Sequence, residues 1–313
     1  MSEDGTVVVG HHWYEGQNEL SYVTRSIAGA ASRWGRVSVL APGPRGLQIA
    51  DGAFDVEGMG EQGAYHWPDT IPPGCVVVVD ELVPEVAANL AVVGPRPVFY
   101  LSSHAEGHDP SWQKIPLFGN DASRRFVKAY IPVNPLAQLH RHNGFGFTGY
   151  QLVLSGQTPS HEDPPAAVAW LTAAFPESYV VVVENAVASA WKARTLRGSV
   201  SVDSRMDLWR LMAHASVCID LAPGPDIARE CVEALRFGTP IVVTKNSGAG
   251  AAHAEASGGA TFADAGGLVE AVASLQVEVR RSRASDAGRK YAAANYGSPA
   301  SFMDSLRELL SGT

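Results

Sequence analysis

Hydrophobic residues in the first part of this chain form short β-branched runs that alternate with helix-like patterns. The apolar runs lie at residues 6–13, 36–42, 75–82 and 97–104, and the helix-like stretches lie at residues 18–34 and 84–93. This alternation is typical of a mostly parallel sheet with helices on both faces. We therefore predict one α/β domain here, with an irregular acidic loop between the second and third apolar runs.

The same alternation begins again after a loosely patterned segment, rich in Pro and Gly, between residues 105 and 148. Apolar runs follow at residues 150–156, 178–185, 199–203, 216–222 and 240–244, and helix-like stretches at residues 164–175, 205–215, 226–238 and 268–283. We predict two Rossmann-like, parallel-sheet α/β domains, residues 1–135 and 136–295, and a C-terminal helix at residues 296–313 that packs back toward the first domain. Two such domains predict a ligand cleft between them, at the carboxyl ends of the strands.

The composition narrows the class of partner and the compartment. The 24 basic and 32 acidic residues give a net charge of −8, which argues against general nucleic-acid binding. Cys75, Cys218 and Cys231 stand far apart in apolar contexts, so we expect buried thiols in a reducing compartment. The chain has no apolar run of about 18 residues and no signal-peptide pattern. We therefore expect a cytoplasmic protein without a transmembrane segment, and peripheral membrane contact is left open.

The main functional hypothesis concerns residues 216–243. A buried strand ends in this stretch, and the turn at residues 223–226 leads into a helix whose N-terminal amides face the crevice and favour an anion. Glu233 is predicted about two turns into the helix, where it needs no role in the core and can direct its carboxylate at sugar or ribose hydroxyls. From spacing alone, a solvated surface glutamate is the alternative.

A longer segment, residues 201–275, resembles the donor-binding half of retaining glycosyltransferases of the GT-B fold, close to glycosyltransferase family 4. That family carries the pattern Glu-Ala-x-x-x-Gly-x-Pro-Val-Val before a glycine-containing loop. The positions that match it are Glu233, Ala234, Gly238, Thr239, Pro240, Val242 and Val243. The closing helices and the stretch at residues 130–135 are also similar to the family, whereas the first domain is short and divergent.

The resemblance implies a nucleotide-sugar donor held by the second domain and an acceptor held by the first. Glu233 would bind the donor ribose, residues Val202 to Ser204 would lie near the base, and His104 would face the sugar. The helix N-terminus would meet the diphosphate or the sugar through Gly224, Asp226 and Ile227. On the acceptor side, Gly16 stands in a loose counterpart of the family's glycine-rich loop. At the end of the first strand, His11 and His12 are local candidates for acceptor contacts, and a satisfied structural histidine is the favoured alternative for either one alone.

Two departures from the family pattern bear on activity. The family commonly has an acidic residue eight positions before its Glu-Ala, where this chain has Pro225 and then Asp226. The family also commonly has an arginine and a lysine after the first strand of this domain, where this chain offers Gln157 but no cation. Lys192 and Lys245 are the replacement candidates for neutralising a diphosphate, with solvated surface charges as the alternative.

We therefore expect a metal-independent glycosyltransferase that moves a sugar from a nucleoside diphosphate to an unknown acceptor with retention. The resemblance implies no metal ion and no further cofactor. No zinc spacing, nucleophile elbow, Walker loop or dinucleotide fingerprint is present in the sequence. The alternative is a catalytically degenerate GT-B protein that binds a glycan, a nucleotide or a partner protein.

Overall fold

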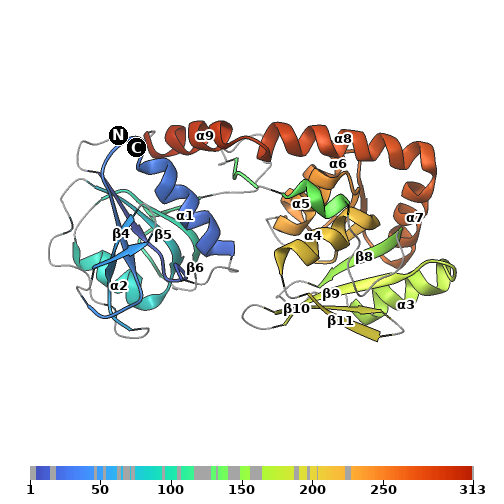
Figure 1. Ribbon diagram of the computed structural model, residues 1–313, viewed down its shortest axis with the longest axis horizontal. Coiled ribbons are helices and arrows are strands. Elements are labelled where there is room, and N and C mark those ends of the chain that lie inside the picture. Colours follow the sequence, from blue (N-terminus) through green and yellow to red (C-terminus); the bar gives the residue numbers. More distant parts are fainter. Residues whose placement is uncertain are drawn as a thin grey trace. The chain divides into compact units, whose positions relative to one another are not determined.

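The computed structural model describes residues 5–14, 19–45, 48–51, 54–61, 65, 71, 75–93, 96–103, 107–115, 128–131, 133–139, 149–155, 164–186, 190–195, 198–202, 204–222 and 227–311. The chain divides into two compact units. The first unit holds the elements up to residue 115 together with the chain from Phe302 onward, and the described part of the second begins at Lys128, before the predicted boundary at residue 135 (Figure 1).

The sheet of the first unit has the strand order β3-β4-β2-β1-β5-β6-β7. The strands are β1 (Thr6–Val9), β2 (Val37–Ala41), β3 (Gln48–Asp51), β4 (Phe54–Gly58), β5 (Val76–Leu82), β6 (Val98–Ser103) and β7 (Gln113–Lys114). Neighbours pair in parallel except β3, which runs antiparallel along β4. The parallel strands thus follow the order of dinucleotide-binding folds, and the order reverses between β1 and β5.

Helices α1 (Glu19–Ala31) and α2 (Pro84–Val93) cover opposite faces of this sheet (Figure 1). Val8 of β1 packs in a cluster with Ala28 of α1, whereas Val7 and Val9 pack with Val86 of α2. Successive side chains of a strand point to opposite faces, so the run of valines needs an apolar partner on each side.

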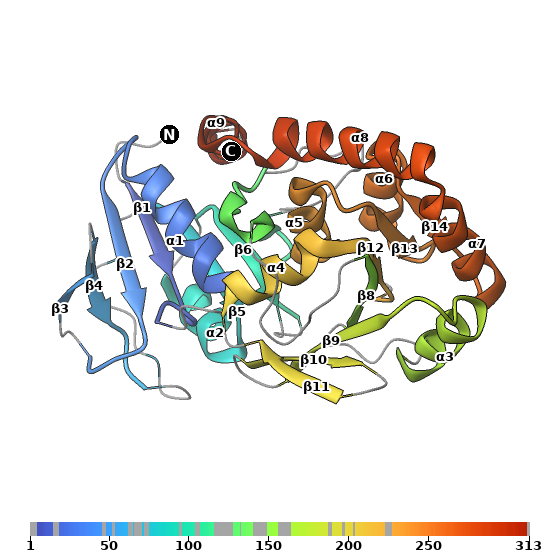
Figure 2. The same ribbon diagram turned by 45° about the vertical axis from the view of Figure 1, so that its right-hand side comes forward.

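The sheet of the second unit has the order β11-β10-β9-β8-β12-β13-β14. The strands are β8 (Tyr150–Ser155), β9 (Val180–Ala186), β10 (Ala190–Thr195), β11 (Gly198–Val202), β12 (Ala215–Asp220), β13 (Ile241–Thr244) and β14 (Ala260–Phe262). The neighbours β9, β8, β12, β13 and β14 pair in parallel, and the order reverses between β8 and β12. Strand β10 pairs antiparallel with β9 and β11, and Figure 2 shows these three strands side by side.

Helices cover both faces of this second sheet as well. They are α3 (Pro164–Ala174), α4 (Arg205–His214), α5 (Arg229–Phe237), α6 (Gly248–Ala256), α7 (Ala265–Gln276) and α8 (Glu278–Tyr296), with the 3-10 turn η1 (Pro135–Gln138) before them and α9 (Pro299–Ser311) after them. Val217 and Ile219 of β12 pack with Leu171 of α3 and Leu268 of α7. None of the helices among the described residues has the length and apolar composition needed to cross a membrane.

The predicted pair of parallel-sheet α/β domains is confirmed, with antiparallel strands added at one edge of each sheet. Three details of the prediction were wrong. The single helix predicted at residues 268–283 is two helices, α7 and α8, because Val277 adopts an extended conformation between them. Strands β3 and β4 occupy part of the predicted irregular loop, and residues 190–195 form the unpredicted strand β10. The three cysteines are buried free thiols, as expected.

Candidate functional site

The reversal of strand order marks one position in each sheet where a ligand site is expected, at the carboxyl ends of the two strands that flank the reversal. In the first unit these strands are β1 and β5. Strand β1 leads into His11 and His12, and β5 carries Asp80 and Glu81 near its end. In the second unit they are β8 and β12, and β12 ends at Asp220.

Asp220 is a buried acid that the sequence analysis did not single out. Burial raises the pKa of Asp220 to about 6, although an amide hydrogen bond from Ala222 opposes the shift; the nearby charge of Glu230 adds to it. The amide N–H of Ala222 donates to Asp220 Oδ1 over 3.0 Å, and the Cys231 thiol lies 3.9 Å from Oδ2. The signal in the sequence was its place as the last residue of a buried strand that has no other charged residue.

This carboxyl group also bears on the anion site predicted at the N-terminus of α5. Ala228 caps the helix without a side-chain hydrogen bond, and its backbone amide opposes the rise in the pKa of Asp220. Negative charge is stabilised at such an end of a helix. The N-terminus of α5, which was predicted to bind an anion, therefore also stabilises negative charge on the carboxyl group of Asp220.

Glu233 lies in the interior of the second unit, and the prediction that it needs no role in the core was wrong. Its side chain has no exposed surface. Arg205 Nε donates to Glu233 Oε1 over 3.1 Å, and Arg205 Nη2 donates to Oε2 over 2.6 Å. Arg229 Nε also donates to Oε1, over 3.0 Å. The carboxylate is buried because two guanidinium groups compensate its charge.

The position of Glu233 along its helix also differs from the prediction. Helix α5 begins at Arg229 and not at residue 226, so Glu233 lies just over one turn from its start. Arg205 and Arg229 are the first residues of α4 and α5, which follow β11 and β12 and so begin at the carboxyl edge of the sheet. Arg205 Nη1 also pairs with Glu230 Oε1 at 3.0 Å, so the two arginines and two glutamates have no net charge.

Burial and a helix cap hold the residues that were predicted near the donor base. Val202 is buried at the end of β11. Ser204 caps α4: its hydroxyl oxygen accepts the amide N–H of Asp207, and the hydroxyl donates to Asp207 Oδ2 over 2.8 Å. Ile227, which was predicted near the diphosphate or the sugar, is buried just before α5. The local geometry thus fixes the backbone on both sides of the Glu233 cluster.

The remaining predicted residues divide between the carboxyl edge and the undescribed parts of the chain. Lys245 is exposed and follows β13 directly, so it stands at the carboxyl edge. Lys192 lies on β10, and its side chain is outside the described part. The other predicted residues also lie outside the described ranges: Gly16, His104, Gln157, Gly224, Pro225 and Asp226.

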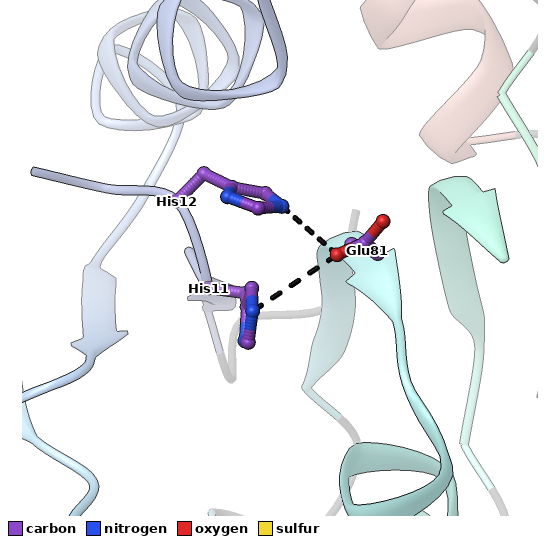
Figure 3. Close-up of side chains that lie close together, drawn as sticks. All are labelled: His11, His12 and Glu81. Carbon is purple, nitrogen blue, oxygen red and sulfur yellow. Dashed lines mark hydrogen bonds and ion pairs between the residues drawn. The ribbon is translucent and has the colours of Figure 1, made fainter. Parts of the chain in front are cut away.

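In the first unit, the two predicted histidines converge on a carboxylate from another strand. His12 Nε2 lies 2.9 Å from Glu81 Oε2, and His11 Nε2 lies 4.0 Å from the same oxygen (Figure 3). These side chains are 7%, 16% and 14% exposed for His11, His12 and Glu81. Both histidines were predicted from the sequence as site residues, whereas Glu81, near the end of the apolar run at residues 75–82, was not.

Asp80 and Tyr65 position the two histidines through hydrogen bonds. Asp80 is fully buried, and its two carboxylate oxygens accept the amide N–H groups of His11 and His12, each over 2.8 Å. Burial raises the pKa of Asp80, although these amides oppose the shift. The Tyr65 hydroxyl forms a hydrogen bond of 2.7 Å with His11 Nδ1. The backbone after β1 and the ring of His11 are therefore both fixed.

The sequence as a whole matches no protein-family model and no curated protein. Solved structures are similar along nearly the whole chain. A sucrose-phosphate synthase from Thermosynechococcus elongatus shares 12% identity over 99% of this chain and 100% of its own, with a TM-score of 0.59. HepE from Anabaena, in complex with UDP and glucose, shares 13% identity over 99% of this chain and 100% of its own, with a TM-score of 0.62. A UDP-forming α,α-trehalose-phosphate synthase from Burkholderia vietnamiensis shares 10% identity over 97% of this chain and 96% of its own, with a TM-score of 0.64.

These similarities, together with the two α/β units, show that the chain has the GT-B fold of glycosyltransferases. The resemblance found in the sequence is confirmed at this level of fold. At 10–13% identity, it is the architecture that these proteins share with the chain.

Proposed function

We propose that this protein is a glycosyltransferase that moves a sugar from a nucleoside diphosphate, with a UDP-sugar as the first candidate donor, to an acceptor. The observation that carries the proposal is the similarity of both units, over 97–99% of the chain, to glycosyltransferases. Two of these are described in terms of UDP, one as UDP-forming and one bound to UDP and glucose. The sequence resemblance to glycosyltransferase family 4 adds the expectation of retention at the anomeric carbon.

The donor is proposed to bind the second unit at the carboxyl edge near α5. The resemblance to glycosyltransferase family 4 implies that Glu233 accepts the ribose hydroxyls there. Because its carboxylate has no exposed surface and accepts three hydrogen bonds from Arg205 and Arg229, donor binding would have to displace one of these arginines. The departing diphosphate would be stabilised without a metal ion by α5 and the exposed ammonium of Lys245. Such stabilisation acts on the charge that develops in the transition state.

The first test is the thermal stability of the protein with UDP, GDP, ADP and dTDP and their sugar conjugates. A ligand at a hundredfold excess over its Kd adds about 2.7 kcal/mol to the stability of the native state. We expect one nucleotide family to raise the melting temperature and its sugar conjugate to release the free nucleotide when an acceptor is present. If no nucleotide shifts the melting temperature, the proposed donor site is refuted.

Lys245→Gln tests the proposed contact with the diphosphate. A hydrogen bond to a charged group contributes about 1.5–3 kcal/mol, so the variant should bind the nucleoside diphosphate roughly tenfold to a hundredfold more weakly. Lys290→Gln, at an exposed position on α8, is the matched control and should bind like the wild type. Equal affinities for both variants would contradict the role of Lys245.

The second candidate function is a catalytically degenerate GT-B protein that binds a nucleotide, a glycan or a partner protein. The neutral cluster of Arg205, Arg229, Glu230 and Glu233 favours it, because these arginines are already paired with carboxylates. A nucleotide that raises the melting temperature while its sugar conjugate stays intact with every acceptor would support this alternative over glycosyl transfer.

A further inference from the structure

We propose that His11, His12 and Glu81 bind a divalent transition-metal ion, with zinc as the first candidate, through the Nε2 atoms of both histidines and a carboxylate oxygen of Glu81. The site lies in the first unit, on one chain segment after β1 and on β5 (Figure 3). It goes beyond the proposed glycosyl transfer, whose donor residues belong to the second unit, and its test does not depend on that activity.

The sheet register brings the ligands together. Residues of β1 pair in parallel with residues 70 positions later on β5, from Thr6 with Val76 to Val9 with Val79. Continued by two residues, this register puts His11 level with Glu81. The strand order also reverses between these two strands, which is where α/β sheets bind ligands. The site therefore follows from the topology and is not a chance meeting of surface loops.

The distances suit a small ion. One ligand atom from each of the three side chains lies within 4.8 Å of the others. Two ligands at zinc-bond lengths in a tetrahedral site stand about 3.3 Å apart. The two separations from Glu81 Oε2, 2.9 Å to His12 Nε2 and 4.0 Å to His11 Nε2, lie on either side of this value. The two separations differ from it by about 0.4 and about 0.7 Å.

The surrounding residues resemble the outer shell of a metal site. A metal-bound histidine usually has its second ring nitrogen held by a hydrogen bond, which fixes the tautomer and the ring orientation. The Tyr65 hydroxyl does this at His11 Nδ1, over 2.7 Å. The buried Asp80 fixes the backbone of both histidines through their amides. Asp80 is also the sequence neighbour of Glu81, so the site has a second carboxyl group close to its ligands.

The donor set indicates the class of ion and the state of the site. Two imidazoles and one carboxylate suit zinc and its neighbours in the transition series, whereas magnesium and calcium prefer oxygen ligands. Three protein ligands leave a fourth position for a water molecule or a hydroxyl oxygen of a ligand. The site is thus of the open type, in which the ion can bind and polarise a further oxygen.

The test is a titration of the full chain, prepared without a polyhistidine tag and freed of metal by a chelator. Cobalt(II) serves as the probe, because its visible absorption reports a four-coordinate site, and zinc is then used to displace it. We expect the absorption to appear at one equivalent of cobalt and to be lost on addition of zinc. His12→Asn and Glu81→Gln should each weaken binding by more than about a hundredfold, and Tyr65→Phe by about tenfold to a hundredfold.

His108→Asn is the matched control, because His108 also belongs to the first unit and contacts the aromatic rings of Tyr100 and Trp112. It should bind cobalt like the wild type. Circular dichroism of each metal-free variant checks that it is folded. If His12→Asn is not folded, the comparison with the control uses Glu81→Gln. The proposal is overturned if the wild type gives no four-coordinate absorption, or if the folded variants of His12 and Glu81 bind cobalt as tightly as the control.

Discussion

Replacing Glu233 with alanine should destabilise the second unit, in addition to any effect on a donor. The carboxylate is fully buried and accepts three hydrogen bonds from Arg205 and Arg229. Arg229 itself is only 8% exposed, so the variant leaves a buried guanidinium without its main compensating charge. Removing one partner of a buried ion pair costs about 3–5 kcal/mol. We expect a loss of this size in the free energy of opening of α4 and α5.

Hydrogen exchange followed by mass spectrometry measures this free energy locally, for peptides that cover α4 and α5, and so separates the two units. Glu255→Ala is the control, because Glu255 is an exposed glutamate on α6 of the same unit, and its loss should change stability by less than about 0.5 kcal/mol. A quadruple variant, Arg205→Met, Arg229→Met, Glu230→Met and Glu233→Leu, should recover most of the stability, because apolar residues can replace the whole buried ionic cluster and no charge of the cluster is left unpaired.

A loss of less than about 1 kcal/mol in the opening free energy of these helices in Glu233→Ala would refute this prediction. It would mean that the Glu233 carboxylate is not needed to compensate the charges of Arg205 and Arg229. The result also decides how donor-binding data are interpreted. If the alanine variant is strongly destabilised, its loss of nucleotide binding says little about ribose contacts. Glu233→Gln, which keeps the shape of the side chain, is then the variant to compare at a temperature where both proteins remain folded.

Two further predictions concern Asp220 and Gly58. Because burial raises the pKa of Asp220 to about 6, the native state holds a proton that the unfolded chain loses between about pH 4 and pH 6, and the unfolding free energy contributed by this group falls by up to about 3 kcal/mol as the pH rises through that window. Urea unfolding of Asp220→Asn across this window should lack that fall, and a pH dependence equal to the wild type's would contradict it. Gly58→Ala places a Cβ in steric overlap with the carbonyl oxygen of Pro44 and should cost about 1–3 kcal/mol in the first unit by urea unfolding. Gly35→Ala, with nothing within 4 Å of its Cβ, should be nearly neutral, and equal losses for the two variants would refute the steric argument.

The sequence by itself determined the class of fold. Runs such as residues 75–82 are apolar at consecutive positions, and only a strand covered on both faces buries every residue of such a run. The alternation with helix-like patterns then requires parallel crossover connections. It also determined that His11 and His12 follow the first strand and that Glu233 lies on the helix after β12, because both statements depend only on local order along the chain.

Only the tertiary structure decided which of these residues meet, and so what each can do. Glu81 reaches the two histidines through the register of β1 and β5, and Arg205 reaches Glu233 through the packing of α4 against α5. Local patterns do not encode such long-range pairings, because a charged residue at a helix start looks the same whether it is solvated or paired. Glu233 was predicted to need no role in the core, and the burial that makes it the centre of an ionic cluster depends on neighbours far away in the sequence.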